Sequence, residues 1–116
     1  MLPAQHRMRH GDEFADAIRF GARSGTPRVV VHFRGSTRAE PARVGFVVSK
    51  AVGGAVQRNL VKRRLRAISA SCLGTFPAGS SVVVRALPPA AAATYPELER
   101  DVVRCLDRSV RAEVKR

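Results

Sequence analysis

The sequence predicts an α+β fold, in which helices pack on a single β-sheet. Three segments alternate apolar and polar residues in the manner of strands, and three others repeat apolar residues at helical spacing. Along the chain these elements follow the order α-β-β-α-β-α. The length of 116 residues suits one hydrophobic core, so we expect residues 1–116 to form a single domain.

The first helix is predicted at residues 12–20, after a basic tail at residues 1–10. Acidic residues crowd its first turn, where they favour the positive end of the helix dipole, and Gly21 can end it. Its apolar face is formed by Phe14, Ala17 and Ile18.

Strands are predicted at residues 28–34, 43–49 and 81–86. Every second side chain is apolar in the first two, which predicts that one face of the sheet is buried and the other is open. In the first strand the buried face holds Val29, Val31 and Phe33, and the open face holds Arg28, Val30, His32 and Arg34. In the second strand the buried face holds Val44, Phe46 and Val48.

The central helix is predicted at residues 55–72 and the last helix from Thr94 onward. Thr94 and Glu97 have the spacing of a capping box, in which each side chain satisfies a backbone N–H of the first turn. Apolar stripes at helical spacing bury one face of each helix. These stripes are Val61, Leu65, Ile68 and Cys72 in the central helix, and Leu98, Val102, Leu106 and Val110 in the last.

The charge is strongly positive and unevenly distributed. A net charge of +12 comes from 18 Arg and 3 Lys, and the planar donor fork of Arg binds phosphate bidentately. None of the nine acidic residues lies between positions 41 and 96. The cations in that interval are Arg43, Lys50, Arg58, Lys62, Arg63, Arg64, Arg66 and Arg85. A block of one sign predicts a surface for a polyanion, with nucleic acid the first candidate.

Two surfaces could bind such a partner. On the central helix, Arg58, Lys62 and Arg66 share a face beside the apolar stripe, with Asn59 and Arg63 next to it. The open face of the sheet could hold a single strand by charge and stacking, through Arg28, His32, Arg34 and Arg43. The alternatives are a solvated helix face, an ordinary exposed His32, and a core contact for Phe14 and Ile18.

Other classes of function have weak support in the sequence. His6 and His10 have a metal-like spacing but no third ligand, and no acid–base pair or nucleophile with a base is recognisable. A DNA-binding dimer would need a base-reading helix and a dimer contact, and neither is visible. Cys72 and Cys105 form no ligand motif, and no signal peptide or membrane-spanning segment is seen, so we expect a monomeric, cytoplasmic protein.

The stretch from Arg43 to Arg66 resembles the protein component of bacterial ribonuclease P. The resemblance rests on Arg43-Val44-Gly45-Phe46-Val47-Val48-Ser49-Lys50, on Val52-Gly53-Gly54-Ala55-Val56-Gln57-Arg58-Asn59, and on Lys62-Arg63-Arg64-Leu65-Arg66. Supporting matches are Asp12-Glu13-Phe14 with Gly21, and Val82-Val83-Val84-Arg85-Ala86 with Pro88. The resemblance covers nearly the whole chain, in order.

This resemblance implies a sandwich like domain 2 of ribosomal protein S5, with a left-handed βαβ crossover. It implies that a partner RNA cleaves the 5′ leader from precursor tRNA with bound Mg²⁺, so the protein itself carries no catalytic residue. The catalytic RNA would be contacted by Lys50, Gly53, Arg58, Asn59, Lys62, Arg63, Arg64 and Arg66. The single-stranded leader would be contacted by Phe14, Ile18, Arg28, His32, Arg43, Val47 and Ser49. No membrane or DNA partner is implied.

The sequence departs from the family pattern at three positions. Leu60 replaces the second arginine of Arg-Asn-Arg, Ala51 replaces a lysine, and His32 stands where an aromatic residue is common. A ribosomal protein has a similar composition, and an independent enzyme would turn over without RNA. Support of tRNA 5′ maturation at low Mg²⁺ separates these alternatives.

Overall fold

The computed structural model describes residues 2–37 and 39–114 as a four-stranded sheet with three α-helices. The strands are β1 (Ala22–Gly25), β2 (Val29–Arg34), β3 (Arg43–Val47) and β4 (Ser81–Ala86), in the order β1-β2-β4-β3. The helices are α1 (Gly11–Phe20), α2 (Ala55–Ser71) and α3 (Tyr95–Val114). The α+β class is therefore confirmed.

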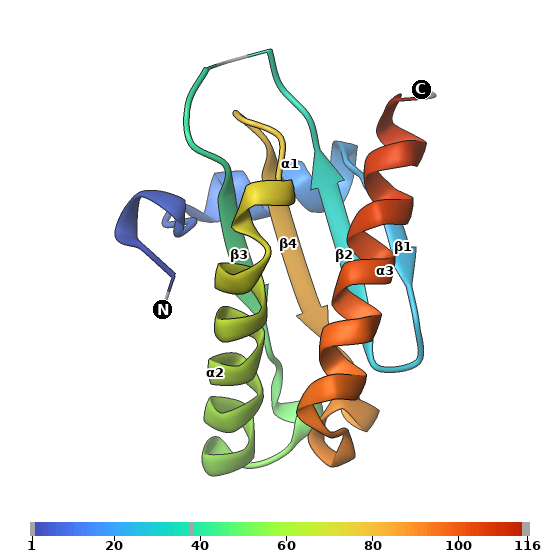
Figure 1. Ribbon diagram of the computed structural model, residues 1–116. Helices are drawn as coiled ribbons and strands as arrows, with labels where there is room; N and C mark the ends of the chain where they lie inside the picture. The colour runs from blue at the N-terminus through green and yellow to red at the C-terminus, as the bar shows by residue number, and fades with distance from the viewer. Residues whose placement is uncertain (1, 38, 115–116) are drawn as a thin grey trace.

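The sheet is mixed, and one of its connections has unusual handedness. β2 pairs antiparallel with β1 and β4, while β3 and β4 are parallel neighbours joined through α2. In Figure 1 both parallel strands run downward, α2 lies in front of them, and β4 is to the right of β3. The β3–α2–β4 connection is therefore left-handed, as the resemblance implied and against the general rule.

The two faces of the sheet carry cores of very different size. α2 and α3 cover one face (Figure 1), where Val31, Leu65 and Leu98 belong to a large buried cluster. α1 crosses the other face, where Met8, Ala17 and Val83 form a small one. The small core covers only part of its face and leaves Val47 and Arg85 partly exposed beside it.

The packing of α1 on the sheet depends on two glycines whose backbone is in close contact with neighbouring atoms. A β-carbon at Gly21 would overlap the carbonyl oxygens of Ala17 and Phe33, and one at Gly45 would overlap the ring of Phe14. Glycine at these two positions therefore lets the helix and its following turn lie directly on the strands.

Strand β1 was not predicted. Its sequence Ala-Arg-Ser-Gly has no large apolar residue to mark alternation, and the strand forms because the chain turns back at Thr26 to pair with β2. The Thr26 backbone N–H donates to the Val29 carbonyl at 2.8 Å, which closes this hairpin.

The prediction of a basic tail at residues 1–10 is not what the described residues 2–10 show. Leu2 and Met8 are buried, and the Met8 N–H donates to the Val44 carbonyl at 3.0 Å. β3 is an edge strand with unpaired backbone groups, so the N-terminal segment covers part of that edge. Across the described chain, no helix is long and apolar enough to cross a membrane.

Candidate nucleic-acid interface

The α2 cationic flank, defined as Arg58, Lys62 and Arg66, occupies one side of α2. These residues follow each other at four-residue intervals, beside the buried stripe of Val61, Leu65 and Ile68. None of the ion pairs found among the described residues involves a cation of α2. The positive charge of this flank is therefore not neutralised within the protein, as expected for a surface that meets a polyanion.

Asn59 and Arg63 extend the flank toward solvent, and both are exposed. Arg58 is only partly exposed, and its Nε atom is buried without a hydrogen-bond partner. The burial of Nε shows that the Arg58 side chain lies against the protein surface, and an unpaired buried N–H is costly, so a partner that supplies an acceptor there would remove this cost.

The entry to α2 places Lys50 and Gly53 before the flank. Lys50 is exposed in a short 3₁₀ turn (Lys50–Val52), and Gly53 adopts φ 156°, a conformation that favours glycine. The Gln57 side chain lies against Gly53 where a β-carbon would otherwise be. The first turn of α2 has neither an acidic residue nor a side-chain cap, so its electropositive end is uncompensated by the chain.

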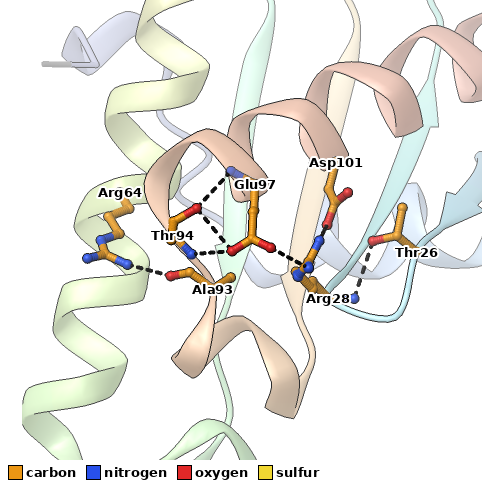
Figure 2. Close-up of polar contacts among 7 residues, drawn as sticks. All are labelled: Thr26, Arg28, Arg64, Ala93, Thr94, Glu97 and Asp101. Carbon is orange, nitrogen blue, oxygen red and sulfur yellow. Dashed lines mark hydrogen bonds and ion pairs between the residues drawn. The ribbon is translucent and has the colours of Figure 1, made fainter.

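Arg64 lies apart from the α2 cationic flank. Its guanidinium turns toward α3 and donates to the Ala93 carbonyl at 2.9 Å (Figure 2). The spacing of Arg64 from Arg58 and Lys62 puts it on the other side of the helix. The unbroken basic sequence Lys62-Arg63-Arg64 does not by itself show this difference in direction.

The α1 face of the sheet is the second candidate surface, and it brings together Phe14 and Val47, two of the predicted leader-contacting residues. Phe14 packs over Gly45 with Val47 nearby in the small core, and both side chains stay partly exposed. Ile18 is one turn further along α1 and 39% exposed, while Ser49 is exposed just beyond β3.

His32 was expected on an open face and is instead buried, with 2% of its surface exposed. His32 pairs across the strands with Val83, and Val83 pairs with Gly45. These three residues lie side by side on the face of the sheet that α1 covers. Both ring nitrogens are buried without a hydrogen-bond partner. Burial lowers the pKa of His32, and the positive charges of Arg85 and Arg23 lower it further, so the ring is neutral at physiological pH.

Arg28 was expected to share the open face of β2, and this expectation is wrong. It precedes β2, and its guanidinium binds Glu97 at 2.7 Å and Asp101 at 3.1 Å, both on α3 (Figure 2). Glu97 also accepts from the Thr94 N–H at 2.9 Å, which completes the predicted capping box. Hydrogen bonds from Thr94, aided by Arg28, hold the pKa of Glu97 below its usual range.

Arg43 lies on the α1 face, but its guanidinium already has a carboxylate partner. Glu13 of α1 accepts from Arg43 at 2.7 Å, and Asp16 pairs with Arg34 at 3.5 Å. These four side chains line a polar cavity of about 410 Å³ at one end of α1. From the sequence, the acidic residues at the start of α1 were explained only by their favourable interaction with the helix dipole. Nothing in the sequence shows that Glu13 and Asp16 face arginines of the sheet.

Arg85 is a candidate that the leader prediction omitted. It pairs in register with Val47, so its side chain shares the α1 face with the partly exposed end of that strand. In the sequence, the alternation of Arg85 with Val84 could have placed Arg85 on the face opposite the large core. The sequence does not show that Arg85 and Val47 remain partly exposed on that face.

Comparisons with known proteins identify relatives of this chain. The sequence model of the family described as Ribonuclease P matches residues 2–110. The ribonuclease P protein component of Beutenbergia cavernae is 62% identical, with 88% of this chain and 86% of that protein covered. The corresponding component of Kocuria rhizophila is 59% identical, with coverage of 87% and 88%.

Solved structures show the same fold. The ribonuclease P protein of Staphylococcus aureus matches with a TM-score of 0.78 at 24% identity, over 88% of this chain and 93% of that one. The Thermotoga maritima protein, solved with 1-(4-fluorophenyl)-2-thiourea, gives 0.75 at 24% identity, over 84% and 94%. The two matches cover between 84% and 94% of each chain, so the fold is shared over most of the length.

Proposed function

The chain belongs to the ribonuclease P protein family, and from this premise we propose that it binds the catalytic RNA and the 5′ leader of precursor tRNA. Membership already makes it a component of a tRNA-processing ribonucleoprotein. The proposal adds a division of labour, in which α2 contacts the catalytic RNA and the α1 face of the sheet contacts the leader.

The observation that carries the proposal is the unpaired charge of α2. Arg58, Lys62 and Arg66 have no ion-pair partner among the described residues, although acids elsewhere bind Arg28, Arg34 and Arg43. A rigid helix that presents several cations on one side can neutralise phosphates of a folded RNA and release their counterions. Lys50 and Gly53 would add contacts at the uncapped start of the helix.

The α1 face fits a single strand by a different chemistry. Phe14, Ile18 and Val47 present partly exposed apolar surface, which suits the faces and sugars of unpaired nucleotides. Arg85 and Arg43 flank this surface from β4 and β3, and Ser49 lies past the end of β3. Arg28 and a stacking role for the buried His32 are left out of this proposal.

Cleavage itself is assigned to the partner RNA. The described residues hold no cluster of three or more His, Cys, Asp or Glu side chains arranged for a metal ion. In this proposal the Mg²⁺ of the reaction is held mainly by the RNA, and the protein supplies positive charge and position. Before assembly the protein is a monomer, and the complex works in the cytoplasm on newly made precursor tRNA.

Cleavage of a precursor tRNA by the cognate ribonuclease P RNA tests the proposal. At low Mg²⁺, adding the protein should restore release of the 5′ leader, and the protein alone should cleave nothing. Phe14→Ala should weaken binding of precursor tRNA by the holoenzyme and leave binding of mature tRNA unchanged. Equal losses for both tRNAs would contradict the division into two surfaces, and no rescue at low Mg²⁺ would contradict the proposed function.

A further inference from the structure

The outward side of α2 carries an exposed apolar pair that the core does not need. Val56 is 83% exposed and Leu60 is 38% exposed, and the two are one turn apart. They lie away from the buried stripe of Val61 and Leu65. A single exposed apolar residue is ordinary, but a pair at this spacing forms a small continuous ridge on the helix.

Helix propensity does not explain the valine at position 56. Valine is a weaker helix former than arginine or lysine, and an exposed position gains nothing from its β-branched shape. At 83% exposure, Val56 makes little packing contact that could offset this cost. Its side chain therefore gains burial only if a partner covers it.

The surroundings of the pair specify the chemistry of that partner. On one side lies the α2 cationic flank, on the other lies Arg64, and Arg63 continues the outward side one turn after Leu60. No acidic residue occurs anywhere in α2. A partner that covers the ridge must therefore combine negative charges at its edges with apolar surface between them.

We propose that Val56 and Leu60 contact ribose and base surfaces of the catalytic RNA, between backbone phosphates bound by the neighbouring cations. An RNA strand has this combination, because sugars and base edges lie between its charged phosphates. This inference rests on the proposed function and specifies how α2 binds its RNA. The phosphates set the salt dependence of binding, and the apolar pair adds a contribution that salt does not screen.

The test compares three proteins for binding to the cognate ribonuclease P RNA over a series of salt concentrations. The first carries Val56→Ser and Leu60→Gln, the second carries Arg58→Gln and Lys62→Gln, and the third carries Val103→Ser as a control. Val103 is 48% exposed on α3, so its substitution removes an exposed valine that does not belong to α2. Circular dichroism and thermal unfolding of each variant confirm the fold.

The apolar variant should bind about tenfold more weakly at every salt concentration, with an unchanged slope of affinity against salt. The charge variant should instead flatten that slope by about 0.7–0.9 for each lost phosphate contact. Val103→Ser should match the wild type. In the complex with the wild type, the protein should protect certain riboses of the RNA from hydroxyl radicals. In the complex with the apolar variant, this protection should be lost at the nucleotides that Val56 and Leu60 contact.

Two results would overturn the inference. One is an apolar variant that binds within twofold of the wild type and keeps every ribose protection, while the charge variant is weakened. In that case α2 still binds RNA, and only the apolar contact is wrong. The other is an equal loss in the apolar variant and in Val103→Ser. If the charge variant also binds normally, the RNA contact of α2 in the proposed function fails as well.

Discussion

The aromatic ring of Phe14 lies directly on the backbone of Gly45, so this ring alone separates the first helix from the third strand at that point. This contact fixes the height of α1 above the sheet and keeps Phe14 at the rim of the α1 face. The position of the proposed leader-binding surface therefore depends on a residue with no side chain.

Gly45→Ala should lower the free energy of unfolding by about 1–3 kcal/mol, because the new methyl group overlaps the Phe14 ring within a paired strand. Urea unfolding measures the loss. Gly11→Ala is the matched control, since a β-carbon at Gly11 meets nothing within 4 Å. Equal stability of the Gly45 variant and the wild type would show that α1 can shift away freely.

Glu13→Gln should strengthen binding of a single-stranded RNA leader, because it frees the Arg43 guanidinium from its 2.7 Å ion pair. The slope of affinity against salt should steepen by about 0.7 for one additional phosphate contact. Asp12→Asn, on the same helix and with the same change in charge, controls for net charge because Asp12 forms none of the ion pairs found. The same gain in both variants would exclude masking of Arg43 by Glu13.

The buried His32 should make stability depend on pH. Its pKa is lowered in the folded protein, so the unfolded chain binds the proton more readily, and stability falls as the pH drops below the unfolded pKa. The loss reaches about 1.4 kcal/mol for each unit that separates the two pKa values.

Unfolding of the wild type and His32→Leu at about pH 7.5 and about pH 5.5 checks this expectation. The wild type should lose more stability than the variant over that interval, whatever the variant does to stability at neutral pH. Parallel losses would mean that folding does not lower the pKa of His32.

Arg28→Gln should lower stability by about 1 kcal/mol and leave RNA binding unchanged, because its bonds to Glu97 and Asp101 join the β1–β2 turn to α3. The loss is small because the Arg28 side chain is 33% exposed, so water screens its ion pairs. Arg104→Gln removes an exposed arginine outside these ion pairs and serves as the control in both assays. A selective loss of leader binding by Arg28→Gln would restore the role first expected for it.

The sequence was sufficient for several elements that a local rule decides. The Thr94–Glu97 capping box, the limits of α1 and the buried stripe of α2 all follow from spacing, and each was predicted within about two residues. The left-handed crossover came only from the family resemblance, since periodicity carries no information on handedness.

The misplaced residues were those whose partners are distant in sequence. Alternation correctly put His32 and Val31 on opposite faces of β2, but it could not show that α1 covers His32. Arg28 binds an acid 69 residues away, and Arg43 binds one 30 residues away. Such pairings are set by the packing of whole elements and leave no local signal.

The most direct test of the central claim measures binding of the cognate ribonuclease P RNA after charge reversal on two different helices. Arg58→Glu with Lys62→Glu changes the unpaired flank of α2, and Arg104→Glu with Arg108→Glu makes the same change in net charge on exposed positions of α3. The α2 variant should bind about a hundredfold more weakly, and the α3 variant should stay within about threefold of the wild type. Equal losses in the two variants would show that only total charge matters and would contradict a specific RNA-binding surface on α2.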